Sequence, residues 1–206
     1  MEVSTTEEPN RRVIMRDKLL NSLPKGAKVA EIGVWEGKFS QKILDLCEPT
    51  ELHLIDPWLY MPEFSNTGFG RKKNENLMEV KYQGVVDAFK DNPIVKIHRA
   101  TSEVALSAME DGSLDWVYID GNHNDPFITN DLALCLKKVK YNGIIAGDDF
   151  NWQAEASGAP VKHAVEKLVA ALGAQASLKL IANQYMIMLN RPAPATKAPP
   201  EGGKKA

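Results

Sequence analysis

Residues 29–40 read VAEIGVWEGKFS, and this stretch decides the fold. An apolar, strand-like run ends at Gly33, a second glycine follows at Gly37, and apolar residues then recur at helical spacing over residues 38–47. Glycine lets the backbone turn tightly and lets a ligand approach it closely. The unpaired N–H groups of a helix N-terminus favour a carboxylate or a phosphate at such a junction. The stretch therefore predicts a strand, a ligand-binding turn and a helix, with a plain strand-to-helix turn as the alternative.

The same alternation of short apolar runs and helix-period segments continues along the chain. Runs rich in β-branched residues predict strands at residues 28–34, 52–56, 95–100, 114–120 and 143–147. Apolar residues at helical spacing predict helices at residues 38–47, 75–89, 102–109, 127–139 and 160–172. This repetition is typical of a mostly parallel sheet with right-handed crossovers. Two last runs, residues 178–182 and 185–189, are separated only by Asn183 and Gln184 and predict an antiparallel hairpin.

The composition indicates one globular domain. The 206 residues are 44% hydrophobic and carry a formal net charge of −2, which gives no basic field for nucleic-acid binding. Cys47 and Cys135 fit buried thiols of a reducing compartment better than a disulfide framework. The polar N-terminus does not resemble a signal peptide, and no apolar run reaches the roughly 20 residues of a membrane span. We therefore expect a cytoplasmic domain over residues 1–190 and a disordered Pro/Ala/Lys tail over residues 191–206, with no membrane or nucleic-acid partner; a homo-oligomer stays open.

The residues at the strand ends indicate which class of ligand the site binds. A dinucleotide site expects Gly-x-Gly-x-x-Gly, but Glu31 stands in place of the first glycine and only two glycines follow. A carboxylate there repels a pyrophosphate and suits a cationic amino group or ribose hydroxyls. Asp56 ends the second strand, where an acidic residue can bind both hydroxyls of a ribose. Thr101 and Ser102 end the third strand, where small polar groups can meet an adenine edge, although both residue types also cap helices.

Together these strand ends offer places for an amino-acid tail, a ribose and a base, and S-adenosylmethionine has all three. The motif order resembles that of the class I methyltransferases: E-x-G-x-x-x-G at residues 31–37, the acidic LIDPW at residues 54–58, and the final hairpin. The resemblance implies a Rossmann-like three-layer α/β sandwich with strand order 3-2-1-4-5-7-6 and an antiparallel seventh strand. Aromatic residues at the strand ends are added as surfaces for adenine, with core packing as their alternative role. The expected cofactor contacts are Glu31, Gly33, Trp35, Gly37, Ser40, Asp56, Trp58, Thr101, Ser102 and Asp120.

Three aspartates mark the ends of the fourth and fifth strands. Asp120 lies in VYIDGNH, residues 117–123, and Asp148 and Asp149 lie in GDDF, residues 147–150. The two strands are neighbours in the expected order, so the carboxylates converge, and close carboxylates require a proton or a cation. Oxygen ligands suit Mg²⁺ or Ca²⁺ rather than zinc. The pattern resembles the metal-dependent O-methyltransferases of the catechol and macrolide-sugar types, which implies Mg²⁺ binding by Asp120, Asp148 and Asp149; turn-capping aspartates are the alternative.

The words VYIDGNH, NGII and VKHAV resemble still more a bacterial branch of small-molecule and sugar O-methyltransferases, many of which carry a histidine where this chain has Asp148. His123 follows Asp120 by three residues, where catechol-type enzymes carry a lysine base. A neutral imidazole there can take the proton of an acceptor hydroxyl as the methyl group transfers. The resemblance therefore implies His123 and Asp120 as catalytic residues, with an ordinary loop histidine as the alternative.

The sequence thus predicts an S-adenosylmethionine-dependent methyltransferase that modifies an oxygen of a small molecule, such as a sugar or phenol hydroxyl, with assistance from Mg²⁺. The rivals are a nicotinamide-dependent oxidoreductase, disfavoured by Glu31 and the missing third glycine, and a non-catalytic nucleoside-binding module. Residues 58–74 form a long aromatic segment after the second strand, on the expected ligand side. We expect this segment to cover the site and to influence the choice of acceptor.

Overall fold

A computed structural model describes residues 11–154 and 158–192, and these residues contain one seven-stranded sheet. The strands lie in the order β3-β2-β1-β4-β5-β7-β6, and β7 runs antiparallel to both β5 and β6. The predicted fold class, strand order and antiparallel seventh strand are therefore confirmed. Most of the tail expected to be disordered, residues 193–206, lies outside the described residues.

The strands and helices follow one another in βαβ units. The strands are β1 (Lys28–Ile32), β2 (Glu51–Asp56), β3 (Val95–Arg99), β4 (Leu114–Ile119), β5 (Val139–Gly147), β6 (Ala176–Ile181) and β7 (Gln184–Leu189). The α-helices are α1 (Arg11–Leu20), α2 (Lys38–Cys47), α3 (Met78–Phe89), α4 (Ser102–Ser107), α5 (Phe127–Lys138) and α6 (Pro160–Leu172). Short 3₁₀ helices are η1 (Pro62–Phe64), η2 (Lys72–Leu77) and η3 (Gly173–Gln175).

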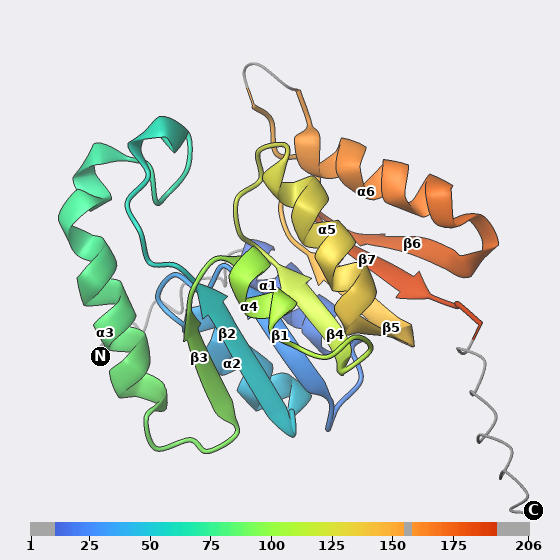
Figure 1. The fold of residues 1–206 in the computed structure, drawn as a ribbon, viewed down its shortest axis with the longest axis horizontal. Helices are drawn as coiled ribbons and strands as arrows, with labels where there is room; N and C mark the ends of the chain where they lie inside the picture. Colours follow the sequence, from blue (N-terminus) through green and yellow to red (C-terminus); the bar gives the residue numbers. More distant parts are fainter. Residues whose placement is uncertain (1–10, 155–157, 193–206) are drawn as a thin grey trace, which may run out of the picture.

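Helices cover both faces of the sheet and give three layers (Figure 1). On one face Leu20 of α1, Ile43 of α2 and Phe89 of α3 pack in one apolar core. On the other face Leu106 of α4 and Leu132 of α5 pack with α6 in a second core. Because both faces of the central strands are covered, those strands are apolar on both sides, as a parallel sheet requires. The carboxyl ends of β1, β2, β3 and β4 consequently meet at one edge of the sheet.

Among the α-helices of the described residues, α1 is the one that the sequence patterns do not predict. Its sequence, RRVIMRDKLL, is half charged, and only Leu19 and Leu20 in its last turn are buried. These leucines join the core beside α2, and α1 also contacts β6 and β7. The helix is therefore fixed by tertiary packing at its C-terminal end, while its N-terminal half extends toward the carboxyl ends of the strands.

Two other boundaries differ from the prediction by more than two residues. The helix expected at residues 75–89 divides into η2 and α3, and β5 begins at Val139 instead of residue 143. Val139 pairs with Leu114, and the regular ladder resumes only with Ile144 opposite Trp116, so the register of β5 shifts in a way that local periodicity does not reveal. In the described part of the chain, no helix combines the length and the apolar character needed to cross a membrane.

Candidate active site

The turn after β1 depends on glycine. Gly33 has φ +88°, and a Cβ atom at this position would lie 2.2 Å from the carbonyl oxygen of Asp120 after β4. Gly37 has φ +73° and precedes α2, and Trp35 between them also has a positive φ of 58°. Only glycine at position 33 allows the ends of β1 and β4 to come this close. The quoted stretch therefore does form the expected strand, turn and helix.

Asp56, at the end of β2, fastens this turn. Its Oδ2 accepts hydrogen bonds from the backbone N–H groups of Val34 and Trp35, both at 3.0 Å, and its Oδ1 accepts from Trp58 at 2.7 Å. The Trp58 indole then donates to the Trp35 carbonyl at 2.8 Å. Burial raises the pKa of Asp56, while the three backbone hydrogen bonds act in the opposite direction. A carboxylate offers about four acceptor positions, so one position remains for a ligand.

Glu31 lies at the end of β1 and is almost completely buried. The Ser40 hydroxyl of α2 donates a hydrogen bond to its carboxyl group at 2.5 Å. Burial raises the pKa of Glu31 to about 8, against the opposing effect of Ser40. The carboxyl group therefore keeps its proton at neutral pH unless a cationic group comes near it.

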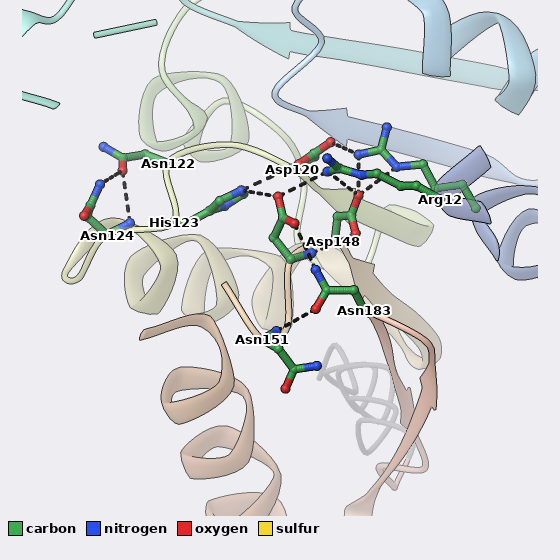
Figure 2. Close-up of polar contacts among 10 residues, drawn as sticks. Arg12, Asp120, Asn122, His123, Asn124, Asp148, Asn151 and Asn183 are labelled. Atoms are coloured by element: carbon green, nitrogen blue, oxygen red, sulfur yellow. Dashed lines mark hydrogen bonds and ion pairs between the residues drawn. The ribbon is translucent and has the colours of Figure 1, made fainter. Parts of the chain in front are cut away.

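Three aspartates and two arginines meet at the ends of β4 and β5 (Figure 2). Arg16 of α1 donates from Nε to Asp148 at 2.7 Å, and from Nη2 both to Asp120 at 2.5 Å and to Asp148. Arg12, one helical turn earlier, donates from Nη2 to Asp148 at 2.9 Å and to Asp149 at 3.2 Å. Burial raises the pKa of Asp120 to about 6, with Arg16 opposing this effect. The converging carboxylates are thus compensated by α1.

His123 lies on the loop after β4 and faces the same cluster. Its Nε2 is 3.0 Å from Oδ2 of Asp149 and 3.7 Å from Oδ1 of Asp120. Asn183 donates to the other oxygen of Asp149 at 3.0 Å, and Trp152 packs edge-on against the imidazole. Burial lowers the pKa of His123, but the hydrogen bond to Asp149 and the nearby carboxylates outweigh it, so the pKa is raised. The imidazole is therefore held by Asp149 in a fixed orientation.

A cavity of about 770 Å³ lies over these strand ends. It extends from the turn after β1 to the His123–Asp149 pair, and residues 59–71 line part of it. A volume of this size accommodates a nucleoside ligand together with a small acceptor. Its aromatic and large apolar lining residues include Trp35, Phe39, Leu59, Met61, Phe69, Phe127 and Trp152.

A family model described as "Methyltransferase domain" matches residues 30–150, which is more than half of the chain and runs from within β1 to beyond the end of β5. The chain belongs to this methyltransferase family. The class I methyltransferase expected from the motifs is thereby confirmed as family and as fold. Among curated proteins, none matches the sequence significantly.

Solved structures share the fold of this methyltransferase at low sequence identity. A Corynebacterium glutamicum protein matches with a TM-score of 0.61 at 12% identity, over 92% of this chain and 85% of its own. The O-methyltransferase NovP gives 0.56 at 19% identity, over 87% and 78%. A Streptococcus mutans protein in complex with SAH (S-adenosylhomocysteine) gives 0.57 at 11% identity, over 88% and 99%. At these identities the likeness shows the fold alone.

The residues that the sequence indicates fall into two groups in this methyltransferase. Those that line the cavity are Glu31, Gly33, Trp35, Asp56, Thr101, Ser102, Asp120, His123 and Asp149. Gly37, Ser40, Trp58 and Asp148 do not line it. All four contact residues that do: the Gly37 N–H donates to the Val34 carbonyl, Ser40 binds Glu31, Trp58 binds the Trp35 carbonyl, and Asp148 binds Arg16.

Among the cavity-lining residues that carry no role in the sequence-based prediction are Arg12, Arg16 and Asp131. Arg12 and Arg16 are four residues apart and so share a helix face, but nothing local shows which acids they meet. Asp131 of α5 accepts a hydrogen bond from the Ser102 hydroxyl, and burial raises the pKa of Asp131 to about 6. Ser102 therefore reaches the site as part of a pair.

The expected magnesium site can be compared with the donors present. Among the described residues, one group of three has ligand atoms within 4.8 Å of one another, namely Asp120, His123 and Asp149; Asp148 is not part of it. Arg16 binds Asp120, and Arg12 and His123 both bind Asp149. The donor atoms are chemically suitable, but cationic groups already hold them. As arranged, they offer no free cation site, and magnesium binding stays a prediction.

Proposed function

We propose that this methyltransferase transfers the methyl group of S-adenosylmethionine to an oxygen of a small molecule, such as a sugar or phenol hydroxyl. The observation that carries the proposal is one continuous cavity that links the turn after β1 to the hydrogen-bonded pair His123 and Asp149. Family membership supports methyl transfer as the reaction. The structural likeness to an O-methyltransferase and to a protein solved with SAH supports the acceptor atom and the cofactor.

The cofactor is proposed to lie along the carboxyl ends of β1, β2 and β3. Its ammonium group would meet Glu31, which loses its proton more readily beside a cation. Its carboxylate would meet the N-terminus of α2. The remaining acceptor position of Asp56 suits a ribose hydroxyl, and Thr101 and the Ser102–Asp131 pair border the place for adenine.

Methyl transfer needs alignment and one proton acceptor. The acceptor oxygen attacks the methyl carbon, the carbon–sulfur bond breaks, and its electron pair stays on sulfur, which yields S-adenosylhomocysteine. With the Nε2–H of His123 donated to Asp149, Nδ1 is the free nitrogen that takes the proton of the hydroxyl. Asp149 steadies the imidazolium that forms. No step requires a group that the chain does not supply, apart from the two substrates.

The proposal is tested by incubating the protein with S-adenosylmethionine and panels of phenols and sugars. Mass spectrometry should detect S-adenosylhomocysteine together with a product heavier by one methyl group. His123→Asn should lower kcat by about 10²–10⁴-fold and leave cofactor affinity unchanged, because the imidazole acts on the acceptor. The matched control is His163→Asn on the exposed side of α6. Absence of cofactor binding, or an unimpaired His123→Asn, would overturn the proposal.

The finer expectations about partners and location belong to the same proposal. We propose a small-molecule acceptor, no nucleic-acid substrate and a cytoplasmic location, with the net charge of −2 as the support for the second point. Turnover with small molecules but none with RNA or DNA fragments would bear out the acceptor class. Size-exclusion chromatography decides whether the protein is a homo-oligomer.

A further inference from the structure

Helix α1 brings two arginines into the cluster of Asp120, Asp148 and Asp149. Arg16 is the more enclosed of the two, since its side chain is 18% exposed against 54% for Arg12. Nε and Nη2 of Arg16 both bind Asp148, and the same Nη2 also reaches Asp120. One guanidinium group therefore bridges the ends of β4 and β5, which is the position that a shared cation would take between two carboxylates.

The formal charges of the cluster nearly balance without an ion. The three aspartates contribute −3 and the two arginines contribute +2, and His123 binds the same oxygen of Asp149, Oδ2, that Arg12 binds. Asp148 is 1% exposed, and its Oδ1 accepts the backbone N–H of Asp149 at 2.8 Å. A buried carboxylate is tolerated only when it is both paired and hydrogen-bonded, and this chain supplies both conditions from its own residues.

A divalent cation would require a different arrangement of the same carboxylate oxygens. Mg²⁺ takes about six oxygen ligands at roughly 2.0–2.1 Å in octahedral geometry. The Oδ2 atoms of Asp120 and Asp148 instead share a donor, Nη2 of Arg16. An ion that entered between them would face two guanidinium groups within a few ångströms, where like charges repel strongly. Binding would therefore require α1 to release both arginines.

We propose that Arg16, assisted by Arg12, takes the place of a divalent cation at this cluster, so that this methyltransferase neither binds nor needs Mg²⁺. The part that concerns turnover rests on the proposed function, whereas the part that concerns ion binding does not. Arg16 is a positioning residue: it fixes Asp120 and Asp148, while Arg12 holds Asp149 against His123. The packing of α1 against the strand ends is therefore required for an active arrangement of the aspartates and His123.

Titration of the full chain with Mn²⁺, followed by electron paramagnetic resonance, tests ion exclusion directly. The wild-type protein should show no saturable binding up to millimolar Mn²⁺. Arg16→Gln leaves three carboxylates with one guanidinium group, so its affinity for Mn²⁺ should rise at least about tenfold. Arg11→Gln removes a charge from the same helix at a residue for which the described structure records no bond to these aspartates, and it should behave as wild type.

Tight Mn²⁺ binding by the wild-type protein would overturn the proposal, and so would an Arg16→Gln variant that binds no better than wild type. Circular dichroism establishes whether Arg16→Gln folds. If it does not fold, Arg12→Gln serves as the test, because the side chain of Arg12 is more exposed and its loss disturbs the fold less. The affinity of Arg12→Gln for Mn²⁺ should rise about threefold. No gain of affinity in Arg12→Gln then overturns the proposal.

Measurements of methyl-transfer activity distinguish a failure of this proposal from a failure of the proposed function. Formation of S-adenosylhomocysteine by the wild-type protein should be unchanged by EDTA and by added Mg²⁺. Arg16→Lys keeps the charge but cannot bridge two carboxylates as a planar guanidinium does, so it should still exclude Mn²⁺ while kcat falls at least about tenfold. Activity that EDTA abolishes and Mg²⁺ restores would overturn the cation replacement and leave methyl transfer intact. A protein that never turns over the cofactor would overturn the function, and the Mn²⁺ titration would still decide the ion-binding part.

Discussion

At the scale of single residues, Glu31 links the site to the stability of the fold. Burial raises the pKa of Glu31 from 4.5 to about 8, so between these pH values the unfolded chain has lost this proton while the folded chain keeps it. The free energy of unfolding therefore falls as pH rises from about 4.5 to about 8. Glu31→Gln removes this decline, and its thermal midpoint should exceed that of wild type by several degrees at pH 8 but not at pH 5, since each kcal/mol shifts the midpoint by roughly 2–4 °C.

Glu36, in the same turn, provides a control of opposite sign. Hydrogen bonds from Lys38 and Lys81 lower the pKa of Glu36, so its contribution to stability is present at neutral pH and is lost as pH falls through the lowered pKa. Glu36→Gln should therefore give no gain at alkaline pH. Scanning calorimetry without ligand gives the stability of wild type and Glu31→Gln as a function of pH. If both stabilities changed with pH in the same way, Glu31 would not be a buried, protonated carboxyl group in the folded protein.

Asp56 has two expected roles, a ribose contact and a structural role in the turn after β1. The structural role can be tested alone with one substitution in the absence of cofactor. The sequence indicates a ribose contact, and the structure adds three backbone hydrogen bonds that hold the turn after β1. Asp56→Asn keeps the shape but turns one acceptor into a donor, so it leaves at least one buried N–H without a partner. Urea unfolding without cofactor should show a loss of about 1–3 kcal/mol. The control is Asp45→Asn on the surface of α2, which should leave the stability unchanged. If Asp56→Asn also left the stability unchanged, the turn would not depend on Asp56.

At the scale of elements, the segment between β2 and α3 folds on itself beside the cavity. The N–H of Met61 donates to the Phe69 carbonyl at 3.2 Å, and the N–H of Gly70 donates to the Thr67 hydroxyl at 3.2 Å. A Cβ atom at Gly70 would lie 2.0 Å from the Phe64 carbonyl oxygen. The segment therefore closes only with glycine at position 70, and its closed form presents Met61 and Phe69 to the cavity.

Gly70→Ala should open this segment and leave the sheet intact. We expect cofactor or acceptor affinity to fall about tenfold or more, with little change in the thermal midpoint, because the segment lies at the rim of the domain. Gly84→Ala is the matched control: Gly84 lies in α3, and the methyl group that alanine adds there would meet no other atom within 4 Å. This change should therefore stabilise the protein by about 0.5–1 kcal/mol. Equal calorimetric affinities of Gly70→Ala and wild type would show that the segment does not shape the site.

At the scale of the whole molecule, the sheet follows from the sequence because each strand and its following helix are encoded locally. The strand ends at Glu31, Asp56 and Ser102 could be placed together for the same reason, since parallel strands carry their ends to one edge. The role of Arg16 could not, because its acidic partners lie 104 and 132 residues away along the chain and α1 has no strong apolar pattern. Charge pairing across such separations becomes visible only when the topology is known.

Binding of the cofactor product should stabilise the entire domain, because the cavity is lined by α1, β1, β2, α4, the ends of β4 and β5, and the segment after β2. A ligand that binds only the folded state at about 100 times its Kd adds about 2.7 kcal/mol. For a chain of this size that corresponds to a rise of roughly 5–10 °C in the thermal midpoint with S-adenosylhomocysteine. NADH should give no rise, since the turn after β1 lacks the third glycine that a dinucleotide site uses. A rise with NADH and none with S-adenosylhomocysteine would reverse the choice between methyl transfer and nicotinamide chemistry that these strand ends support.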